Sequence, residues 1–380
     1  MPFDVHISLQ KLLTGLIVVI VPLSVVGLYL TSNSDTNLQQ SVGAHFRTIA
    51  QADSAIASQF FGDVLSSVSA VGADGRIVDA IATTNRSHNH ISAETIAARS
   101  QRAEREWDTP EGDSLVKEVL SSPVSGWLQH YRTLNPRLLK IIVADENGAA
   151  IGATDKPVTY TQADKESWET IARGKGSVHV TEVRYDERNR LNYVEIDVPV
   201  LEESSGRFVG AVSALADISG LFPILNRQHV GRTGRILLVK DDGTVVSGPN
   251  VTPELKLKAE EFAAVHDVLG TLEGRETGFV TAAMKSENRI VGFADVGLKH
   301  SYPNLSWLIL VSQEEREALA PVRSLGHFAL LMVVLGLLML TLLLAYFSMH
   351  RQQELTAVEV LPSRGSAQGR ASAYRIADDG

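Results

Sequence analysis

Two uncharged apolar runs, residues 12–30 and 328–347, lie near the two ends of this 380-residue chain. A helix rises about 1.5 Å per residue, so either run is long enough to cross the roughly 30 Å hydrocarbon core of a membrane. Two spans place both chain ends on one side of the membrane and the segment between them on the other. The sequence therefore predicts a two-pass membrane protein with transmembrane helices at residues 12–30 and 328–347.

The first run can also be read as a signal peptide, because Lys11 precedes it. The apolar part of a signal peptide is usually only about 7–15 residues long, and small residues follow it at a cleavage site. Residues 28–32 offer no A-x-A pattern. We therefore expect an uncleaved span.

Basic residues in short flanking segments predict the orientation of the spans. Lys11 precedes the first span, and Arg351, Arg364, Arg370 and Arg375 follow the second. An excess of Lys and Arg in short loops marks the cytoplasmic side. Residues 1–11 and 349–380 are thus expected in the cytoplasm and the middle of the chain outside it. The Ser-, Ala-, Gly- and Arg-rich tail has little apolar periodicity, so we expect it to be disordered.

Composition excludes several classes of function. The chain has no cysteine, so disulfides, thiolate catalysis and Cys-ligated metals are excluded. A formal net charge of −9, without a basic stripe, argues against a nucleic-acid partner. None of the G-x-S-x-G, P-loop, G-x-G-x-x-G or H-E-x-x-H patterns occurs, and His88 and His90 are expected in a solvated loop. We expect no enzymatic activity, no cofactor and no metal.

Helical periodicity dominates the first third of the exported segment. One apolar stripe on a long helix is formed by Leu38, Val42, Phe46, Ile49, Ile56, Phe60, Val64, Val68 and Val71. Further helices are expected over residues 79–131. One begins after Ser92, an interruption falls at Trp107 and Pro110, and another helix begins at Asp113.

From Leu138 onward the pattern changes to strands, and it repeats after about a hundred residues. An apolar strand enters an Asp/Asn/Gly turn at residues 141–148 and again at residues 237–243, which predicts two β-hairpins. A helical segment follows each hairpin, at residues 164–173 and 254–269, and a strand pair closes each unit. The repeat predicts two small α+β modules joined near residues 218–234.

With these features the chain resembles the bacterial double Cache sensor domains, in which a long helix from the first membrane span supports two PAS-like modules. The resemblance covers residues 33–322 and rests on the two hairpins, the Tyr185-Asp186 pair, the Val198-Pro199-Val200 strand end and the strand from Val209 to Asp217. It implies an α+β fold with a first, membrane-distal module at about residues 75–219 and a second, membrane-proximal module at about residues 234–315. The implied location is the bacterial inner membrane.

The resemblance also implies a ligand site in the first module. Amino-acid binders of the family carry an Arg-x-Trp-Tyr segment that grips the ligand carboxylate and an Asp near the end of the last strand that binds the ammonium. The corresponding ligand-binding residues are Trp168, Asp217, Tyr185, Tyr160 and Glu166. Glu166 replaces the Arg and Glu169 replaces the Tyr. A free carboxylate would lose its bidentate partner, so these residues favour a neutral or cationic ligand such as an amine.

Structural roles for the same residues stay open. Trp168 can be part of the core, and Asp217 can cap the segment at residues 218–225. Both glutamates can face solvent. Asp197 interrupts the apolar alternation of its strand and is expected on a solvated face.

These observations predict a membrane-anchored extracytoplasmic small-molecule sensor that signals through its transmembrane helices to a separate cytoplasmic or membrane partner. A tail of 32 residues, from 349 to 380, is too short to bury a catalytic core, so no output domain is expected in this chain. A homodimer through the long helix is left open. The alternative is a structural or assembly protein that uses the same fold as a docking surface.

Overall fold

The computed structural model describes residues 9–173, 177–225, 227, 230–249, 256–269, 277–284, 287–320, 334–342 and 344–346, and gives only the backbone, with the Val18 side chain, for residues 9–36. Two compact units are formed, one by Ser32–Ala320 and the other by Met1–Thr31 with Pro321–Gly380.

The two predicted spans belong to the smaller unit. Residues 12–30 lie within helix α1 (Leu9–Gly72), and residues 334–342 and 344–346 of the second run are helical. The remaining residues of the second run, together with the tail at residues 349–380, lie outside the described residues. Across the described part of the chain, no helix has both the length and the apolar character that a membrane crossing requires.

The apolar stripe predicted for the long helix is the centre of the larger unit. Buried residues of α1 include Phe46, Ala50, Phe61 and Val68, each at most 3% exposed. They belong to one hydrophobic cluster together with buried residues of both sheets. The helix therefore supplies one face of the core to each module.

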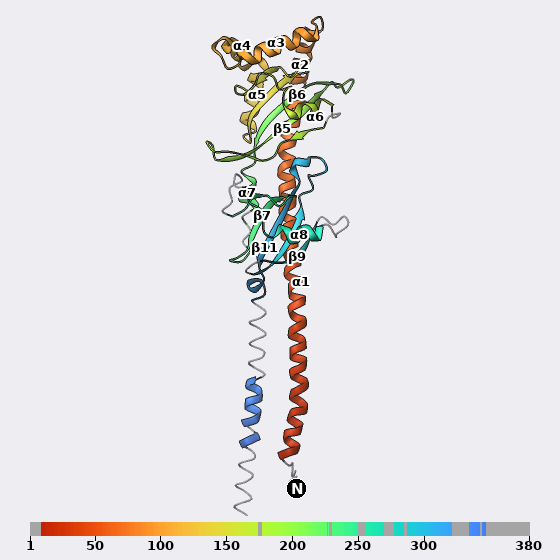
Figure 1. The fold of residues 1–380 in the computed structure, drawn as a ribbon, viewed down its shortest axis with the longest axis vertical. Helices are drawn as coiled ribbons and strands as arrows, with labels where there is room; N and C mark the ends of the chain where they lie inside the picture. Colours follow the sequence, from red (N-terminus) through yellow and green to blue (C-terminus); the bar gives the residue numbers. More distant parts are fainter. Residues whose placement is uncertain are drawn as a thin grey trace, which may run out of the picture. The chain divides into compact units, whose positions relative to one another are not determined.

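The first module begins with helices and continues with a six-stranded antiparallel sheet (Figure 1). Its helices are α2 (Gly75–His88), α3 (Ala93–Glu106), the short 3-10 helix η1 (Pro110–Gly112), α4 (Asp113–Leu120) and α5 (Pro123–Leu134). Ser92 caps α3 by accepting from the backbone N of Thr95, and α3 ends at Glu106 with Trp107 as its C-cap, where the sequence predicts an interruption.

The first sheet has the strand order β2-β1-β6-β5-β3, and β4 also pairs with β5. Its elements are β1 (Leu138–Asp145), β2 (Ala150–Ala153), helix α6 (Glu166–Arg173), β3 (His179–Val180), β4 (Arg184–Asp186), β5 (Leu191–Leu201) and β6 (Phe208–Asp217), and the short helix α7 (Leu221–Leu225) follows.

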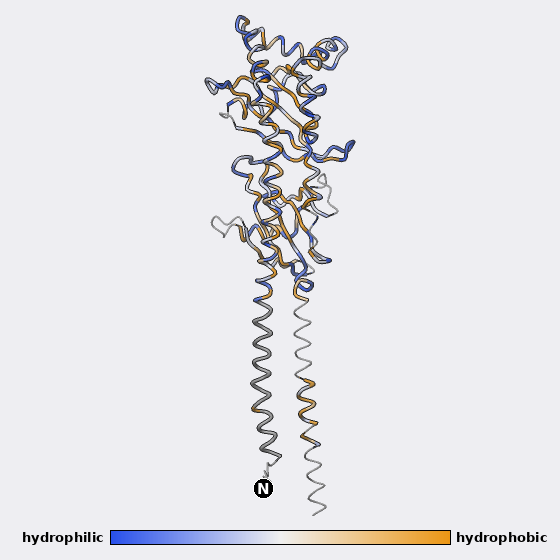
Figure 2. Tube along the Cα trace, turned by 180° about the vertical axis from the view of Figure 1, so that it is seen from behind, coloured by the Kyte–Doolittle hydropathy of each residue, from blue (hydrophilic) through white to orange (hydrophobic). Residues whose placement is uncertain are grey.

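The second sheet has five strands in the order β8-β7-β11-β10-β9, which repeats the connectivity of the first. Its elements are β7 (Arg235–Lys240), β8 (Val245–Ser247), helix α8 (Phe262–Leu269), β9 (Thr277–Ala283), β10 (Asn288–Asp295), the 3-10 helix η3 (Pro303–Leu305) and β11 (Trp307–Glu314). The two hairpin glycines, Gly148 and Gly243, have φ values of +85° and +82°, which only glycine adopts without strain. Figure 2 shows apolar residues along the strands of both sheets and hydrophilic residues in many of the loops.

One carboxylate interrupts the apolar stripe of α1. Asp53 is fully buried, and neither of its side-chain oxygens has a hydrogen-bond partner among the described residues. Burial disfavours the charged form and raises the pKa of Asp53 from 3.8 to about 6. Because the folded-state pKa is raised, the stability that Asp53 contributes is present below about pH 4 and is lost as the pH rises to about 6.

We expect Asp53→Asn to stabilise the protein at about pH 7.5, by up to about 3 kcal/mol, because a shift of about two pKa units is removed. Near pH 4 the two chains should be nearly equal. Thermal unfolding of the full-length chain in detergent at both pH values checks this, with the exposed Asp63→Asn on the same helix as the control. A variant that is less stable at pH 7.5 would show that the ionised carboxylate has a stabilising partner.

Candidate ligand-binding site in the first module

Each sheet packs one face against α1 and presents the other, here called the outer face, to the segment that follows its hairpin. In β5, Val194, Ile196 and Val198 belong to the cluster around α1. Side chains alternate along a strand, so Glu195 and Asp197 lie on the outer face. Helix α6 packs on this sheet next to β5. The outer face is therefore the surface on which the two modules can be compared.

Strand pairing shows which residues take equivalent places in the two modules. In the first sheet Ser213 of β6 pairs with Ile142 and with Asp197. In the second sheet Leu310 of β11 pairs with Leu237 and with Phe293. Ile142 and Leu237 stand at the same distance before the hairpin glycines, Gly148 and Gly243. A polar pair, Asp197 and Ser213, thus occupies the place that Phe293 and Leu310 fill in the second module.

The segments that follow the two hairpins also differ in polarity between the two modules. The backbone N of Ala150 donates to Tyr160, and the backbone N of Val245 donates to Leu257 in the equivalent bond. Two positions further on, Gln162 and Ala259 donate to the hairpin glycines. In the same register, Lys165 of the first module is equivalent to Phe262 of the second. Polar or amphipathic side chains in the first module therefore replace apolar ones in the second.

The outer face of the second sheet is filled. Its buried apolar residues form a cluster of their own, which includes Leu237, Val291, Phe293, Leu308, Leu310 and, from α8, Val265. Close packing of this kind leaves little space for a ligand. The second module's outer face is a hydrophobic core.

Asp197 is the most deeply buried acid on the outer face of the first sheet, with 1% of its surface exposed. Ser213 donates to its Oδ1, and the side chain of Ser167 on α6 also acts to lower its pKa. Its Oδ2 has no partner among the described residues. Burial, and then the nearby charge of Glu195, raise the pKa of Asp197, whereas the bonds from the serines and the charge of Lys165 oppose this.

Two further groups complete the polar cluster. Lys165 forms an ion pair with Glu195, and both side chains are partly buried. Gln162 is 1% exposed and donates to the carbonyl of Thr159, while its Oε1 has no partner among the described residues. The unsatisfied atoms of Asp197 and Gln162 are both acceptors. The cluster therefore lacks hydrogen-bond donors, and a ligand with N–H or O–H groups would supply them.

Two cavities border the segment that carries this cluster. The larger, of about 510 Å³, is lined by α3 and by Asn147, Thr161, Ala163 and Asp164. The smaller, of about 210 Å³, is lined by α2, α3, the β1–β2 hairpin and Tyr160. Gln162 and Lys165 of the buried cluster come from the same segment as Thr161 and Asp164. The open space thus lies beside this segment, and neither Asp197 nor Gln162 is among the residues that line the two cavities.

Of the residues predicted from the sequence, Tyr160 lines the smaller cavity. Its ring centroid lies 5.3 Å from that of Trp107, and burial, followed by the charge of Asp145, raises its pKa to about 12. Trp168 is half-buried on α6 and packs edge-to-face against Phe208, with ring centroids 5.5 Å apart. These two aromatic residues flank the segment that contains Gln162 and Lys165.

The other predicted residues lie further apart. Glu166 is exposed in the first turn of α6, and Tyr185 is half-buried on β4, where it pairs with Asn192. Asp217 ends β6, and its Oδ1 accepts from the backbone N of Ser219, which lies before α7 begins at Leu221, so the bond closes a turn and does not cap the helix. Nine residues of strand, about 30 Å, separate Phe208 from Asp217. The structure therefore does not bring Trp168 and Asp217 together.

Glu169 stands where amino-acid binders of the family carry a tyrosine. Its side chain is exposed and forms an ion pair with Arg173 one turn later on α6.

Sequence reasoning missed the centre of the cluster. Asp197 was expected on a solvated face, and this prediction is wrong, because α6 and the segment around Gln162 cover that face. The available signal was the combination of Asp197 with Ser213 on the neighbouring strand, both of which interrupt apolar runs. His88 was also expected in a solvated loop, but it ends α2 and is partly buried beside Asp145.

Comparisons with known proteins give one family and a set of solved structures. A family model described as a Cache domain, of the double Cache type, matches residues 34–322. No curated protein matches the chain. Among solved structures, the ligand-binding domain of Campylobacter jejuni chemoreceptor Tlp3 with 4-methylisoleucine is 12% identical and covers 74% of this chain and 94% of its own, with a TM-score of 0.47.

Two further solved structures are similar in fold. The ligand-binding domain of the Pseudomonas aeruginosa amino-acid chemoreceptor PctC with GABA is 15% identical and covers 71% of this chain and 98% of its own, with a TM-score of 0.44. The ligand-binding domain of Pseudomonas fluorescens chemoreceptor CtaA with L-isoleucine is 14% identical and covers 76% of this chain and 98% of its own, with a TM-score of 0.46.

The Lys165–Glu195 pair next to Asp197 can be tested through stability. We expect Lys165→Met to cost about 1–3 kcal/mol, because Glu195 is left without its cation beside a second acid. The double variant Lys165→Met/Glu195→Gln should regain most of this loss. Chemical unfolding of the full-length chain measures both, and a double variant no more stable than the single one would contradict the pairing.

Proposed function

The chain belongs to the Cache-domain family, in its bacterial double Cache form, and from this premise we propose that it is a membrane-anchored sensor whose first module binds a small molecule outside the cytoplasm. The proposal has three parts, which are the binding site, the chemistry of the ligand and the membrane topology. Each is supported by separate observations.

The binding site rests on the difference between the two outer faces. The same fold closes the second face with Phe293 and Leu310 and places the carboxylate of Asp197 with Ser213 in the first. An unpaired buried carboxylate oxygen costs folding free energy, and packed apolar side chains would avoid that cost. A ligand that bonds to Asp197 would offset it. This single contrast carries the proposal that the first module is the ligand-binding one.

The ligand chemistry follows from the atoms that lack partners. Asp197 Oδ2 and Gln162 Oε1 accept hydrogen bonds, and Glu195 adds a second acid to the cluster. A cation with N–H donors matches these groups, whereas a free carboxylate would be repelled. Tyr160 and Trp168 provide aromatic surface nearby, which also attracts cations. We therefore propose an amine or another positively charged small molecule as the ligand.

The ligand prediction can be tested by thermal shift with amines, amino acids, carboxylates and nucleobases, since ligand binding to the folded state raises apparent stability. Calorimetry with propylamine and its α-carboxylated counterpart, 2-aminobutyrate, then tests the preference for charge. We expect the amine to bind better, and Asp197→Asn to weaken binding about 10- to 100-fold by removing a charged hydrogen bond.

The exposed Glu187→Gln is the matched control for loss of an acid in the same module. A clear preference for the amino acid, unaffected by Asp197→Asn and by Glu166→Gln, would contradict the cation proposal. If no compound of the screen binds, the alternative of a structural docking domain gains support. Glu166, Tyr185 and Asp217 remain proposed ligand contacts, and their alanine variants test them by affinity and stability measured together.

The membrane topology is proposed from the two apolar runs and the basic residues that flank them. Both chain ends lie in the cytoplasm in this proposal, and the two modules lie outside it. A reporter that is active only outside the cytoplasm should be active when fused near Ser204 and silent when fused at Gly380. The reverse pattern would contradict the topology.

Signal transfer completes the proposal. Ligand binding in the first module would be passed through α1 and the second apolar run to a separate cytoplasmic or membrane partner that carries out the response. A homodimer through α1 is left open, and crosslinking at exposed α1 positions such as Gln51 in membranes measures whether it forms.

A further inference from the structure

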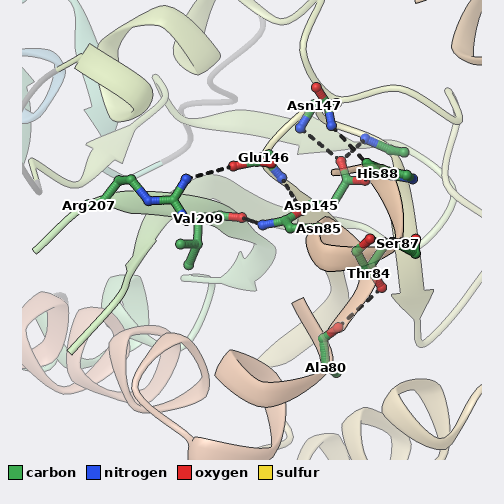
Figure 3. A network of polar contacts seen from close by, with 11 residues as sticks. Ala80, Thr84, Asn85, Ser87, His88, Asp145, Glu146, Asn147, Arg207 and Val209 are labelled. Atoms are coloured by element: carbon green, nitrogen blue, oxygen red, sulfur yellow. Dashed lines mark hydrogen bonds and ion pairs between the residues drawn. The ribbon is translucent and has the colours of Figure 1, made fainter. Parts of the chain in front are cut away.

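His88, Asp145 and Asn147 meet beside the smaller cavity, away from the Asp197 cluster. Asp145 ends β1, Asn147 lies in the β1–β2 hairpin, and His88 ends α2. Figure 3 shows their side chains directed toward one another, with Glu146 turned away toward Arg207. All three line the cavity of about 210 Å³.

Asp145 is satisfied on one side only. Its Oδ1 accepts from the backbone N of Asn147 at 2.9 Å and from that of Ala149 at 3.0 Å. Its Oδ2 has no hydrogen-bond partner among the described residues, although the side chain is fully buried. The Nδ1 of His88 lies 3.8 Å from Oδ2, which is too long for a hydrogen bond but close for an ion pair when the imidazole is protonated.

The hairpin itself does not require this carboxylate. The second module makes the same turn with Lys240 in the equivalent place, where the backbone N of Lys240 donates to Thr244 and that of Gly243 donates to Lys240. The matching bonds in the first module join Asp145 with Ala149 and Gly148 with Asp145. In the second module Asp242 supplies a turn carboxylate instead, with its Oδ1 accepting from the backbone N of Thr244. The turn therefore accounts for Oδ1 of Asp145 but not for its buried, unpaired Oδ2.

The surroundings of Asp145 leave room for a small polar molecule. At about 30 Å³ per water molecule, the cavity holds roughly seven groups of that size. Thr84, Ser100 and Tyr160 line it as well. Burial raises the pKa of Tyr160 to about 12, so its hydroxyl stays protonated and available for hydrogen bonding.

Other charged groups near the cavity have partners or face solvent. Glu146 pairs with Arg207 at 3.2 Å, and Glu104 accepts from the backbone N of Thr161. Arg99 of α3 lines the rim and is exposed, so water screens its charge. Asp164 is exposed and lines the neighbouring cavity. Burial raises the pKa of Asp145, and the backbone bonds from Ala149 and Asn147 oppose this. Asp145 is thus the buried acid that an entering ligand meets.

We propose that this cavity is a second binding site, for a small organic cation with a primary ammonium group, in which Asp145 Oδ2 accepts from the ammonium and protonation of His88 releases the ligand. No group of three His, Asp or Glu side chains in the described part of the chain is placed to hold a metal ion, which favours an organic cation. Nδ1 of neutral His88 already accepts from the side-chain amide of Asn147 at 3.5 Å, so the ammonium bonds to Asp145 Oδ2.

Protonation of His88 changes both of its interactions. An imidazolium donates rather than accepts, and its charge would lie 3.8 Å from the oxygen that the ammonium uses. A proton on His88 and the ligand would therefore compete for Asp145. The site would respond to amine and to acidity together.

The test is a titration of the full-length chain in detergent with propylammonium, by calorimetry, in an Asp197→Asn background that disables the first site. We expect binding at about pH 8. At about pH 5.5 the affinity should be lower by about tenfold or more, because a charged hydrogen bond is lost. Asp145→Asn, whose amide oxygen keeps the turn bonds, should abolish binding at pH 8. Ala103→Leu fills the cavity and tests the same point if Asp145→Asn disturbs folding.

His88→Gln should bind propylammonium equally at both pH values, whereas His90→Gln, its exposed neighbour, should keep the pH dependence of the parent chain. Unchanged binding in Asp145→Asn, or equal binding of propionate, would overturn the site. Retained pH dependence in His88→Gln would overturn the role of the histidine. Ligand binding at the Asp197 site, on which the proposed function rests, is measured separately in an Asp145→Asn background. Each of the two proposed sites can therefore be rejected without rejecting the other.

Discussion

Packing of the α1 stripe against both sheets is the constraint on which the larger unit depends. An added Cβ at Gly292 would come within 2.4 Å of the Phe46 backbone, so β10 approaches the helix directly. Further along, Phe61 packs edge-to-face on Trp307 of the second sheet, with ring centroids 4.7 Å apart. Gly72, at the end of the helix, faces Val198 and Val212 of the first sheet. One rigid helix therefore contributes to both cores and fixes which face of each sheet is occupied.

Because α1 occupies one face of each sheet, binding chemistry is confined to the outer faces and to the ends of the strands. The second module closes its outer face with an apolar core and pairs its buried acid, Glu261, with Arg235 and Arg289. Glu261 Oε2, Asp197 Oδ2 and Asp145 Oδ2 all lack a hydrogen-bond partner among the described residues, but in that part of the chain neither acid of the first module forms an ion pair with an arginine or a lysine. Specialisation of the two modules thus follows from a small set of side chains on a shared framework.

Periodicity and turn chemistry were sufficient to predict that the helices, the hairpins and the repeat exist, since these depend on local pattern, although the helix expected at residues 254–269 begins only at Phe262. Ser92 and the hairpin glycines are examples in which one residue type determines the local structure. The site was harder to predict. Alternation shows that Asp197 faces away from α1, but it cannot show that a helix from residues 166–173 covers that side. Asp145 was hidden for a different reason, because an acid before a glycine turn already has an explanation in the turn.

The repeat also separates residues that the fold requires from residues that it does not. Where both modules carry the same residue type, as at Gly148 and Gly243, backbone geometry explains it. At two places a buried acid of the first module has an apolar or basic residue as its equivalent in the second. Asp197 corresponds to Phe293 and Asp145 to Lys240, so the fold tolerates both residue types at these positions. Desolvating a carboxylate without full pairing costs free energy that the alternative residue avoids. An interaction from outside the chain would offset this cost, which is the physical argument for the ligand binding proposed at both places.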